Sequence, residues 1–218
     1  MEKRIIEKTA DGSDTLYIPE LHEHYHSVKG AWTETEHIFI RCALLAHPKK
    51  ELKVLEVGFG TGLNAFQTLL TASKEQLKVE YHSLEKYPLS FEEVNALNFS
   101  QSEDFKQLHQ SLWNQKVIIN DSFSLFKHHV DFTQLASLDI GNNFDIVYFD
   151  AFAPEKQPYM WSKQLFEQIY VLLNDGAILT TYCAKGAIRR MLQEIGFLVE
   201  RLPGPPEGKR EILRAIKQ

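Results

Sequence analysis

A short, mostly apolar segment that runs directly into three closely spaced glycines limits the possible folds of this chain more than any other feature. Residues 52–57 are followed by Gly58-Phe59-Gly60-Thr61-Gly62, and apolar residues then recur at helical spacing from Leu63 onward. Glycine permits tight turning and a close approach of the backbone to a ligand. Ligands of open α/β sheets bind beyond the carboxyl ends of the strands, where such a turn lies. The sequence therefore predicts an α/β domain with a ligand site at this turn.

The alternation of strand-like and helix-like segments continues to the C-terminus. Strands are predicted over residues 52–57, 79–84, 116–120, 144–149, 177–182, 197–202 and 212–216. Helical apolar spacing lies between several of them, so we expect a doubly wound, mostly parallel sheet. The last two strands share a loop too short for a parallel crossover, which predicts an antiparallel last strand. The polar segment 86–115 lacks a clear period, and no element is predicted there.

The first 47 residues have a different pattern from the rest. Weak alternation within residues 14–28 predicts one or two short strands. Thr33 and Glu36 have capping-box spacing ahead of an apolar run, which predicts a helix over residues 34–46 that Pro48 stops. We therefore expect a small N-terminal β/α extension, residues 1–47, packed on a core domain of residues 48–218.

Composition excludes several classes of protein. The net charge of −5 rules out a strongly basic nucleic-acid coat protein, although not a local basic face. Two cysteines, Cys42 and Cys183, are too few for a disulfide scaffold or a multi-cysteine zinc site. The N-terminal residues lack an apolar core of signal-peptide length, and no segment approaches the roughly 20 apolar residues of a membrane span. We expect a cytoplasmic, soluble protein without a membrane partner, with a monomer favoured.

Alternating histidines form the most metal-like pattern in the chain. His22, His24 and His26 would share one face of a strand, and with His37 they resemble a ligand set. A half-exposed polar strand explains the same pattern, and no metal is expected.

Glycine spacing favours a particular ligand. A dinucleotide turn reads G-x-G-x-x-G, whereas here the third glycine comes one residue earlier, at Gly62. The pattern G-x-G-x-G, preceded by the acid Glu56, resembles the S-adenosylmethionine loop of class I methyltransferases. Three further acids come at the ends of predicted strands. Glu85 could accept the ribose hydroxyls, Asp121 could accept the adenine amino group, and Asp150 would lie next to the transferable methyl group. The expected cofactor-binding residues are Glu56, Gly58, Gly60, Gly62, Asn64, Glu85, Lys86, Asp121, Ser122 and Asp150.

Longer motifs carry a more specific resemblance. The runs are Gly58-Phe59-Gly60-Thr61-Gly62-Leu63-Asn64, Glu85-Lys86-Tyr87-Pro88-Leu89, Asp150-Ala151-Phe152-Ala153-Pro154 and Pro158-Tyr159-Met160-Trp161. Together they resemble the methyltransferase domain of the MnmC-type enzymes of tRNA 5-methylaminomethyl-2-thiouridine biosynthesis, over about residues 11–216. The resemblance implies the seven-stranded sheet of class I S-adenosylmethionine-dependent methyltransferases. No second glycine fingerprint follows for the family's flavin-dependent oxidase domain, so methylation alone is expected.

The resemblance also implies a reaction. It is methyl transfer to the amine of 5-aminomethyl-(2-thio)uridine at the wobble position of tRNA. The nucleophile must be a neutral amine, and much of the rate gain comes from alignment. Asp150 is the expected catalytic residue, orienting the amine through an N–H bond, while Phe152 and Pro154 form an apolar wall against the uracil ring.

Substrate-binding residues are expected in two groups. The first surrounds the site: Tyr25, Lys156 and Trp161. The second lies in the C-terminal part, which is relatively basic. Residues 151–218 hold 10 basic and 7 acidic side chains, whereas residues 1–150 hold 14 basic and 22 acidic ones. Its members are candidates for phosphate contacts: Arg189, Arg190, Lys209 and Arg210. An ordinary solvated face explains each of them singly as well.

Two alternatives remain open. An aminopropyltransferase of the spermidine-synthase type shares the sheet and the nucleoside-binding acids, but its loop after the fourth strand carries a further acid where this chain has Phe152-Ala153-Pro154. A methyltransferase acting on a small amine or a protein is the other, because no RNA-binding appendage is obvious.

Overall fold

A single mixed sheet of eight strands forms the centre of the computed structural model, which describes residues 3–218. The strand order is β10-β11-β9-β8-β4-β5-β7-β6. The bounds are β4 (Glu51–Val57), β5 (Lys78–Glu85), β6 (Lys116–Asn120), β7 (Phe123–His129), β8 (Phe144–Phe149), β9 (Leu173–Thr181), β10 (Phe197–Pro203) and β11 (Glu211–Lys217). The five strands from β9 to β7 in this order are mutually parallel. The chain reverses its direction of winding between β4 and β8, which makes that junction the expected ligand site.

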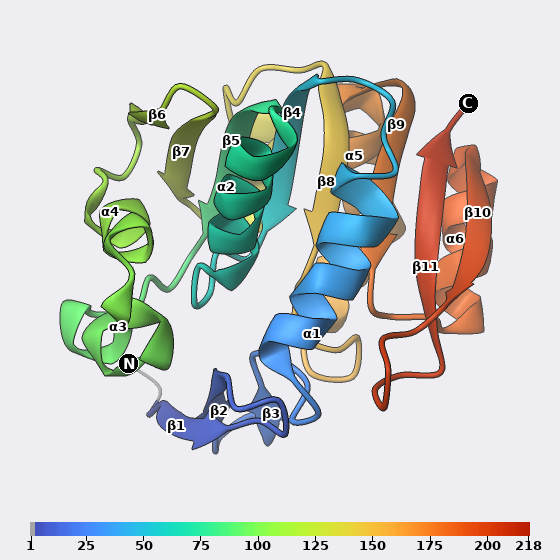
Figure 1. Cartoon of the computed structure of the whole chain (residues 1–218). Coiled ribbons are helices and arrows are strands. Elements are labelled where there is room, and N and C mark those ends of the chain that lie inside the picture. Colours follow the sequence, from blue (N-terminus) through green and yellow to red (C-terminus); the bar gives the residue numbers. More distant parts are fainter. Residues whose placement is uncertain (1–2) are drawn as a thin grey trace.

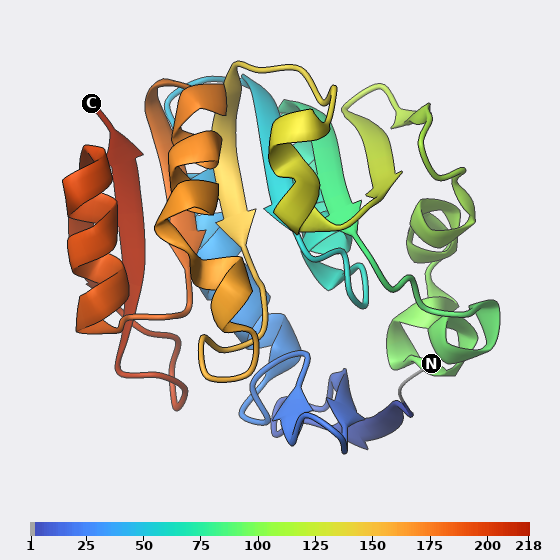
Figure 2. The same cartoon turned by 180° about the vertical axis from the view of Figure 1, so that it is seen from behind.

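Helices cover both faces of the sheet. One face carries α1 (Ala31–Thr35), η1 (Glu36–Leu44), α2 (Leu63–Glu75) and α4 (Glu103–Gln110), as Figure 1 shows. The other carries η3 (Phe132–Ser137), α5 (Lys163–Leu172) and α6 (Gly186–Ile195), seen in Figure 2. The remaining short helices are α3 (Phe91–Ala96), η2 (Asn98–Gln101) and η4 (Pro158–Trp161). Each face buries its own apolar cluster, as both faces of a parallel sheet require.

The predicted doubly wound sheet with an antiparallel last strand is confirmed, because β11 is antiparallel to both β9 and β10. The number of strands was wrong: the sheet has eight, not seven. The eighth strand is β7, which forms an antiparallel hairpin with β6, the strand predicted over residues 116–120. Strand β7 was not predicted, since it alternates buried with half-exposed residues and contains Lys127 and two histidines. It is nevertheless the parallel neighbour of β5.

The helix predicted over residues 34–46 begins earlier. It starts at Ala31, and from Glu36 to Leu44 it continues as a π-helix. Thr33 does not cap it, because the capping groups come from the turn at residues 9–13, which is distant in sequence. Asp11 Oδ2 accepts the Thr33 N–H at 2.9 Å, and Ser13 Oγ accepts the Ala31 N–H at 3.1 Å. These bonds satisfy amides that otherwise lack intrahelical partners.

A small antiparallel sheet lies beyond the carboxyl ends of the parallel strands (Figure 1). It consists of β1 (Ile5–Lys8), β2 (Asp14–Ile18) and β3 (Glu23–His24), in that order. Arg4 anchors its first strand to the segment after β5, since its guanidinium donates to Glu93 in α3 at 3.1 Å and to the Tyr87 carbonyl at 2.8 Å. The N-terminal residues therefore cover the end of the sheet at which a ligand is expected.

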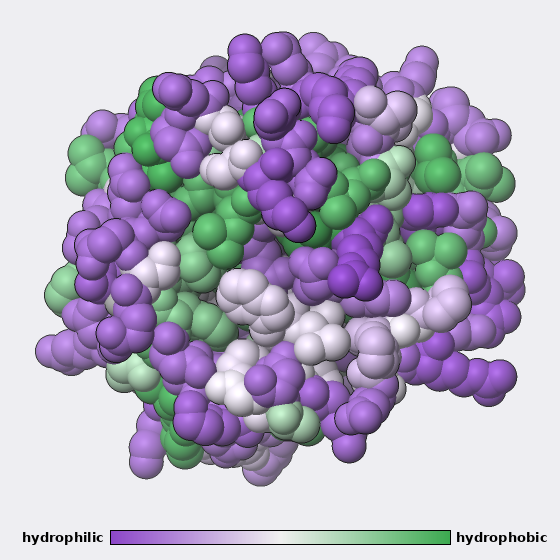
Figure 3. All heavy atoms as spheres, viewed as in Figure 1, coloured by the Kyte–Doolittle hydropathy of each residue, from purple (hydrophilic) through white to green (hydrophobic). Residues whose placement is uncertain are grey.

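In the view of Figure 3, hydrophilic residues dominate and hydrophobic ones gather in separate patches. Among residues 3–218, no helix has the length and apolar character needed to cross a bilayer.

A substitution at Phe166 tests the packing of the core between β8 and α5. It is fully buried on α5, and its ring centroid lies 4.5 Å from that of Phe149. We expect Phe166→Ala to lower the free energy of unfolding by about 3–5 kcal/mol, because the cavity it leaves adds to the lost burial. Urea denaturation measures this loss. Val171→Ala on the same helix, where the side chain is 76% exposed, should change stability by less than about 0.5 kcal/mol. Equal losses in the two variants would contradict this packing.

Candidate active site

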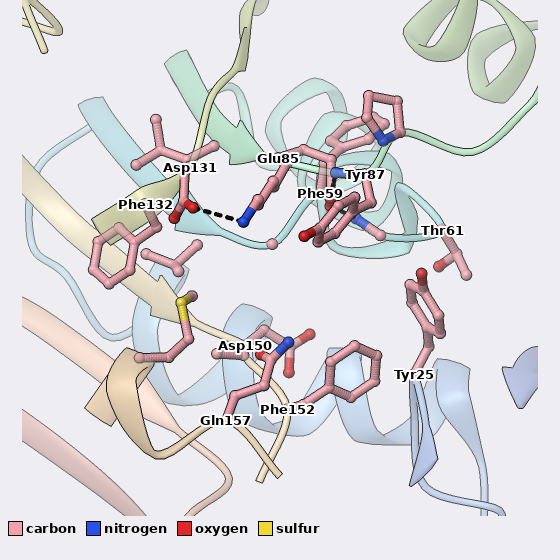
Figure 4. A pocket seen from close by; sticks show the side chains of 18 of the residues that line it. Tyr25, Phe59, Thr61, Glu85, Tyr87, Asp131, Phe132, Asp150, Phe152 and Gln157 are labelled. Atoms are coloured by element: carbon pink, nitrogen blue, oxygen red, sulfur yellow. Dashed lines mark hydrogen bonds and ion pairs between the residues drawn. The ribbon is translucent and has the colours of Figure 1, made fainter. Parts of the chain in front are cut away.

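A cavity of about 870 Å³ lies at the carboxyl ends of β4, β5, β7 and β8. Figure 4 shows its two sides: Asp131, Glu85, Tyr87 and Phe59 on one, and Asp150, Gln157, Phe152 and Tyr25 on the other. Its volume lies in the upper part of the roughly 300–1,000 Å³ range of small-molecule sites. The cavity thus forms where the topology predicts a ligand.

The glycine turn is built for close contacts. A Cβ at Gly58, where φ is +93°, would lie 3.2 Å from the backbone oxygen of Asp150. A Cβ at Gly60 would lie 3.0 Å from the ring of Tyr25. Gly58 and Gly60 both line the cavity, as does Asn64 in the first turn of α2. These glycines therefore let the turn pass directly between the end of β8 and the N-terminal segment.

Two carboxylates occupy one side of the cavity. Glu85, at the end of β5, accepts the Gly60 N–H at 3.0 Å and the Tyr87 N–H at 2.6 Å. Asp131, two residues beyond β7, pairs with Lys86 Nζ at 2.7 Å (Figure 4). Hydrogen bonds with Lys86 and Thr133 overcome the opposing desolvation and lower the pKa of Asp131, so it is ionised at neutral pH. This side of the cavity presents carboxylate oxygens that can accept hydroxyl or amino donors.

Asp150 lies across the cavity, directly after β8. Its Oδ2 accepts a hydrogen bond from Asn64 Nδ2 at 2.9 Å. Desolvation, reinforced by the charge of Glu34, raises the pKa of Asp150 to about 7, while Asn64 and Lys209 oppose that rise. A carboxyl group poised near neutrality can exchange a proton under physiological conditions.

Aromatic side chains stand beside Asp150. Phe152 and Tyr25 meet edge to face, with ring centroids 5.2 Å apart, and both line the cavity. Trp161 lies behind them, 5% exposed, and donates its Nε1 hydrogen to the Phe152 carbonyl at 2.8 Å. It lies outside the cavity lining and holds the position of Phe152 instead.

Of the predicted site residues, the structure brings one group together around the cavity: Tyr25, Gly58, Gly60, Asn64, Glu85, Lys86, Asp150, Phe152 and Lys156. Pro154 is outside the lining, but it begins the turn in which the Ala153 carbonyl accepts the amides of Lys156 and Gln157. Those two residues then face the cavity. Gly62 is also outside the lining; a Cβ there would lie 2.7 Å from His109 Nε2.

Asp121 and Ser122 are not at this site. The prediction that they follow a parallel strand is wrong, because they form the turn of the β6–β7 hairpin. The Ser122 carbonyl accepts the N–H of Val79, near the start of β5, so this turn lies at the opposite end of the sheet. The acid that follows the correct strand is Asp131.

Glu56 lies beneath the cavity and not in it. Its side chain is fully buried, and one carboxyl oxygen accepts the Ser83 hydroxyl at 2.5 Å. Burial raises the pKa of Glu56 well above its usual value, with a further contribution from Asp150. Four predicted substrate contacts also lie outside the cavity lining: Arg189, Arg190, Lys209 and Arg210.

Sequence reasoning missed several lining residues, among them Arg4, Tyr87, Asp131, Phe132, Gln157 and Tyr159. Asp131 had a usable signal, because it follows an apolar and polar alternation at residues 123–129 that could have been read as a strand. Arg4 had no such signal, since only the tertiary structure brings it to this edge of the sheet.

The histidines of the metal-like pattern, His22, His24, His26 and His37, do not come together as a ligand set. His24 contacts Glu7, His37 contacts the Pro203 carbonyl, and His26 lies between the hydroxyls of Thr15 and Thr61. Across residues 3–218, no group of three or more His, Cys, Asp or Glu side chains is arranged to hold a metal ion.

The donor set fits S-adenosylmethionine. Glu85 can accept the ribose hydroxyls and Asp131 the adenine amino group, while Val130 and Phe132 supply apolar surface for the base. Asn64 and Asp150 mark the opposite end, where the methyl group would face an acceptor. When bound, this cofactor supplies a methyl group on a positively charged sulfur.

Paired variants test the choice of acid. Asp131→Asn removes a charged acceptor from the cavity, so we expect cofactor affinity to fall roughly tenfold, the equivalent of a hydrogen bond to a charged group. The matched control is Asp121→Asn, which should leave affinity unchanged because Asp121 lies at the other end of the sheet. Isothermal titration calorimetry with S-adenosylmethionine measures both. A loss confined to the Asp121 variant would contradict the assignment.

Comparison with known proteins gives a consistent result. A family model described as "S-adenosyl-L-methionine-dependent methyltransferase" matches residues 82–218. The "tRNA 5-methylaminomethyl-2-thiouridine biosynthesis bifunctional protein MnmC" of Pseudoalteromonas atlantica is 34% identical over 220 residues, which cover 88% of this chain and 30% of that protein. Its counterpart in Stutzerimonas stutzeri is 34% identical over 214 residues, 89% of this chain and 32% of that protein. The chain thus spans about a third of the length of these relatives.

Solved structures agree. The crystal structure of MNMC2 from Aquifex aeolicus superposes with a TM-score of 0.83 at 26% identity, covering all of this chain and 71% of that one. CalS10 of Micromonospora echinaspora, described as an amino pentose methyltransferase, shares the fold with a TM-score of 0.53 at 14% identity. With the family model matching well over half of the residues and the cavity fitting the cofactor, this chain belongs to the S-adenosyl-L-methionine-dependent methyltransferases.

Proposed function

We propose that this methyltransferase methylates the amine of 5-aminomethyl-(2-thio)uridine at the wobble position of tRNA. The observation that carries the proposal is the placement of Asp150: a carboxyl group with a pKa of about 7, at the cavity edge and beside the aromatic ring of Phe152. An amine acceptor attached to a flat base needs these two features side by side. Similarity to MnmC proteins supplies the choice of base.

Asp150 would act on the amine. Its carboxylate accepts one N–H bond, which turns the nitrogen lone pair toward the methyl group. Transfer of the methyl group would leave the electron pair of the C–S bond on sulfur and would turn the amine into a secondary ammonium. That ammonium would then lose a proton, and the Asp150 carboxylate is the acceptor we assign to it. Asn64 fixes the carboxylate through its bond to Oδ2, so alignment is set before substrate binds.

The base would rest on the aromatic wall. Phe152 and Tyr25 offer stacking and edge contacts, and stacking of a base on an aromatic side chain is worth roughly 1–3 kcal/mol. Lys156 also lines the cavity and can meet a phosphate of the anticodon loop. Arg189, Arg190 and Arg210 would add contacts with more distant phosphates.

Nucleoside mass spectrometry tests the proposal. Purified protein is incubated with S-adenosylmethionine and tRNA that carries 5-aminomethyluridine, and the nucleosides are then analysed. We expect one methyl group to appear on that nucleoside and on no other. If cofactor binds but no nucleoside is methylated, the proposal is wrong, and a small amine or protein becomes the acceptor to seek. An aminopropyl group gained from the decarboxylated cofactor would instead indicate the spermidine-synthase type.

Asp150→Asn tests the role of the carboxylate. The amide keeps the shape and can still accept the Asn64 bond, but it is a poor acceptor for the amine and its proton. We expect kcat to fall roughly 10²–10⁴-fold with cofactor affinity retained. In the wild type, the rate should rise with pH through about 7 as Asp150 ionises, and the variant should lack that step.

Stability provides the control for folding. The pKa of Asp150 is raised in the folded state, so the folded protein binds more protons than the unfolded chain between about pH 4 and 7. The stability contributed by this group is therefore lost as pH rises through that window. Asp150→Asn should melt at a higher temperature than the wild type at pH 8. Unchanged turnover in a folded Asp150→Asn variant would remove Asp150 from the mechanism.

A further inference from the structure

We infer that the ion pair between Lys209 and Glu34 is a positioning and charge-balancing device for Asp150, and not a contact with tRNA phosphates. The inference rests on the role proposed above for Asp150. It assigns a function to the loop between β10 and β11, which contributes no side chain to the cavity lining.

The pair joins three segments that are distant in sequence. Lys209 Nζ lies 2.9 Å from Glu34 Oε1 and 4.4 Å from the centroid of the Tyr182 ring. The other carboxyl oxygen of Glu34 accepts the N–H of Ser27 at 2.7 Å. Glu34 is only 7% exposed, so its charge depends on these partners for compensation. The cationic group of Lys209 is thus already engaged by a carboxylate and an aromatic face.

Two short routes lead from this pair to Asp150. Tyr182 donates its hydroxyl hydrogen to the carbonyl of Ala151 at 2.9 Å, which fixes the backbone next to Asp150. On the other side, Thr35 follows Glu34 in α1 and donates its hydroxyl hydrogen to Asn64 Oδ1 at 2.8 Å. Asn64 in turn donates to the Asp150 carboxylate. Both the backbone and the carboxylate of the proposed catalytic residue therefore depend on elements that the ion pair holds.

The two members of the pair act on Asp150 with opposite sign. The negative charge of Glu34 raises the pKa of Asp150, and the positive charge of Lys209 lowers it. Further titratable groups interact with Asp150 or with the pair: Glu56, Tyr81, Tyr182, Cys183 and His26. None of these carries a positive charge near neutral pH, because burial holds the pKa of His26 at about 4. Lys209 is accordingly the cation that offsets Glu34 here.

This opposition allows a decisive test. Lys209→Met keeps most of the length of the side chain and removes its charge, leaving Glu34 uncompensated. Glu34→Gln keeps an oxygen for Ser27 and removes the negative charge. We expect the midpoint of Asp150 ionisation to move upward by roughly one pH unit in the first variant and downward by a similar amount in the second. The double variant should return close to the wild-type midpoint.

Two readouts are used on the full chain. One is the carboxyl carbon NMR titration of Asp150 in the ligand-free protein, assigned with Asp150→Asn. The other is the pH profile of single-turnover methyl transfer to tRNA carrying 5-aminomethyluridine. The matched control is Lys78→Gln, which breaks the ion pair with Glu51 at the opposite end of the sheet and should leave both midpoints unchanged.

Each alternative has its own signature. A purely structural pair would lower activity in both single variants without moving the midpoint in opposite directions, and that result overturns the inference. A phosphate contact by Lys209 would raise the KM for tRNA and flatten its salt dependence at an unchanged midpoint, which also overturns it. Opposite NMR shifts without any methylation of tRNA by the wild type would support the charge balance and contradict the proposed function instead.

Discussion

The absence of a side chain at Gly58 is the constraint on which the site depends. A Cβ there would lie 3.2 Å from the backbone oxygen of Asp150, and the positive φ is one that other residues rarely adopt. Because Gly58 has no Cβ, the ends of β4 and β8 can approach each other at the point where the direction of winding reverses. The Gly58 N–H also reaches the carbonyl of Leu84 at 2.9 Å, so the end of β5 is bound to the same turn. Glu85 and Asp150 are placed by these contacts on facing sides of one cavity.

Differences in burial and pairing give the three acids Glu56, Asp131 and Asp150 different pKa values. Glu56 is enclosed beneath the turn, where desolvation and the neighbouring Asp150 raise its pKa well above its usual value and so favour its protonated form. Asp131 is paired with Lys86 and stays ionised. Asp150 lies between these extremes, with a pKa near neutrality. Similar side chains at neighbouring strand ends therefore differ in pKa because of how each is solvated and paired, and Asp150 is the one with a pKa near neutrality, where a carboxyl group exchanges protons readily.

Much of this was predictable from the sequence, for identifiable reasons. The glycine turn, the acid at Glu85 and the motif from Asp150 to Phe152 are local patterns that directly follow apolar strands, and the structure places them around the cavity. The error at Asp121 arose because β6 and β7 form a hairpin, so a residue at the end of β6 faces the wrong end of the sheet. Trp161 and Lys209 could not be placed in advance, since their partners, the Phe152 carbonyl and Glu34, are set by tertiary packing. Glu34 itself reads as an ordinary exposed helix residue in the sequence.

A crystal structure with S-adenosylhomocysteine bound would test the central claim most directly. The account predicts that the ribose hydroxyls contact Glu85, that the adenine amino group faces Asp131, and that the sulfur atom points across the cavity toward Asp150 and Phe152. A cofactor whose sulfur points away from Asp150, or whose adenine lies at the β6–β7 turn beside Asp121, would contradict the account.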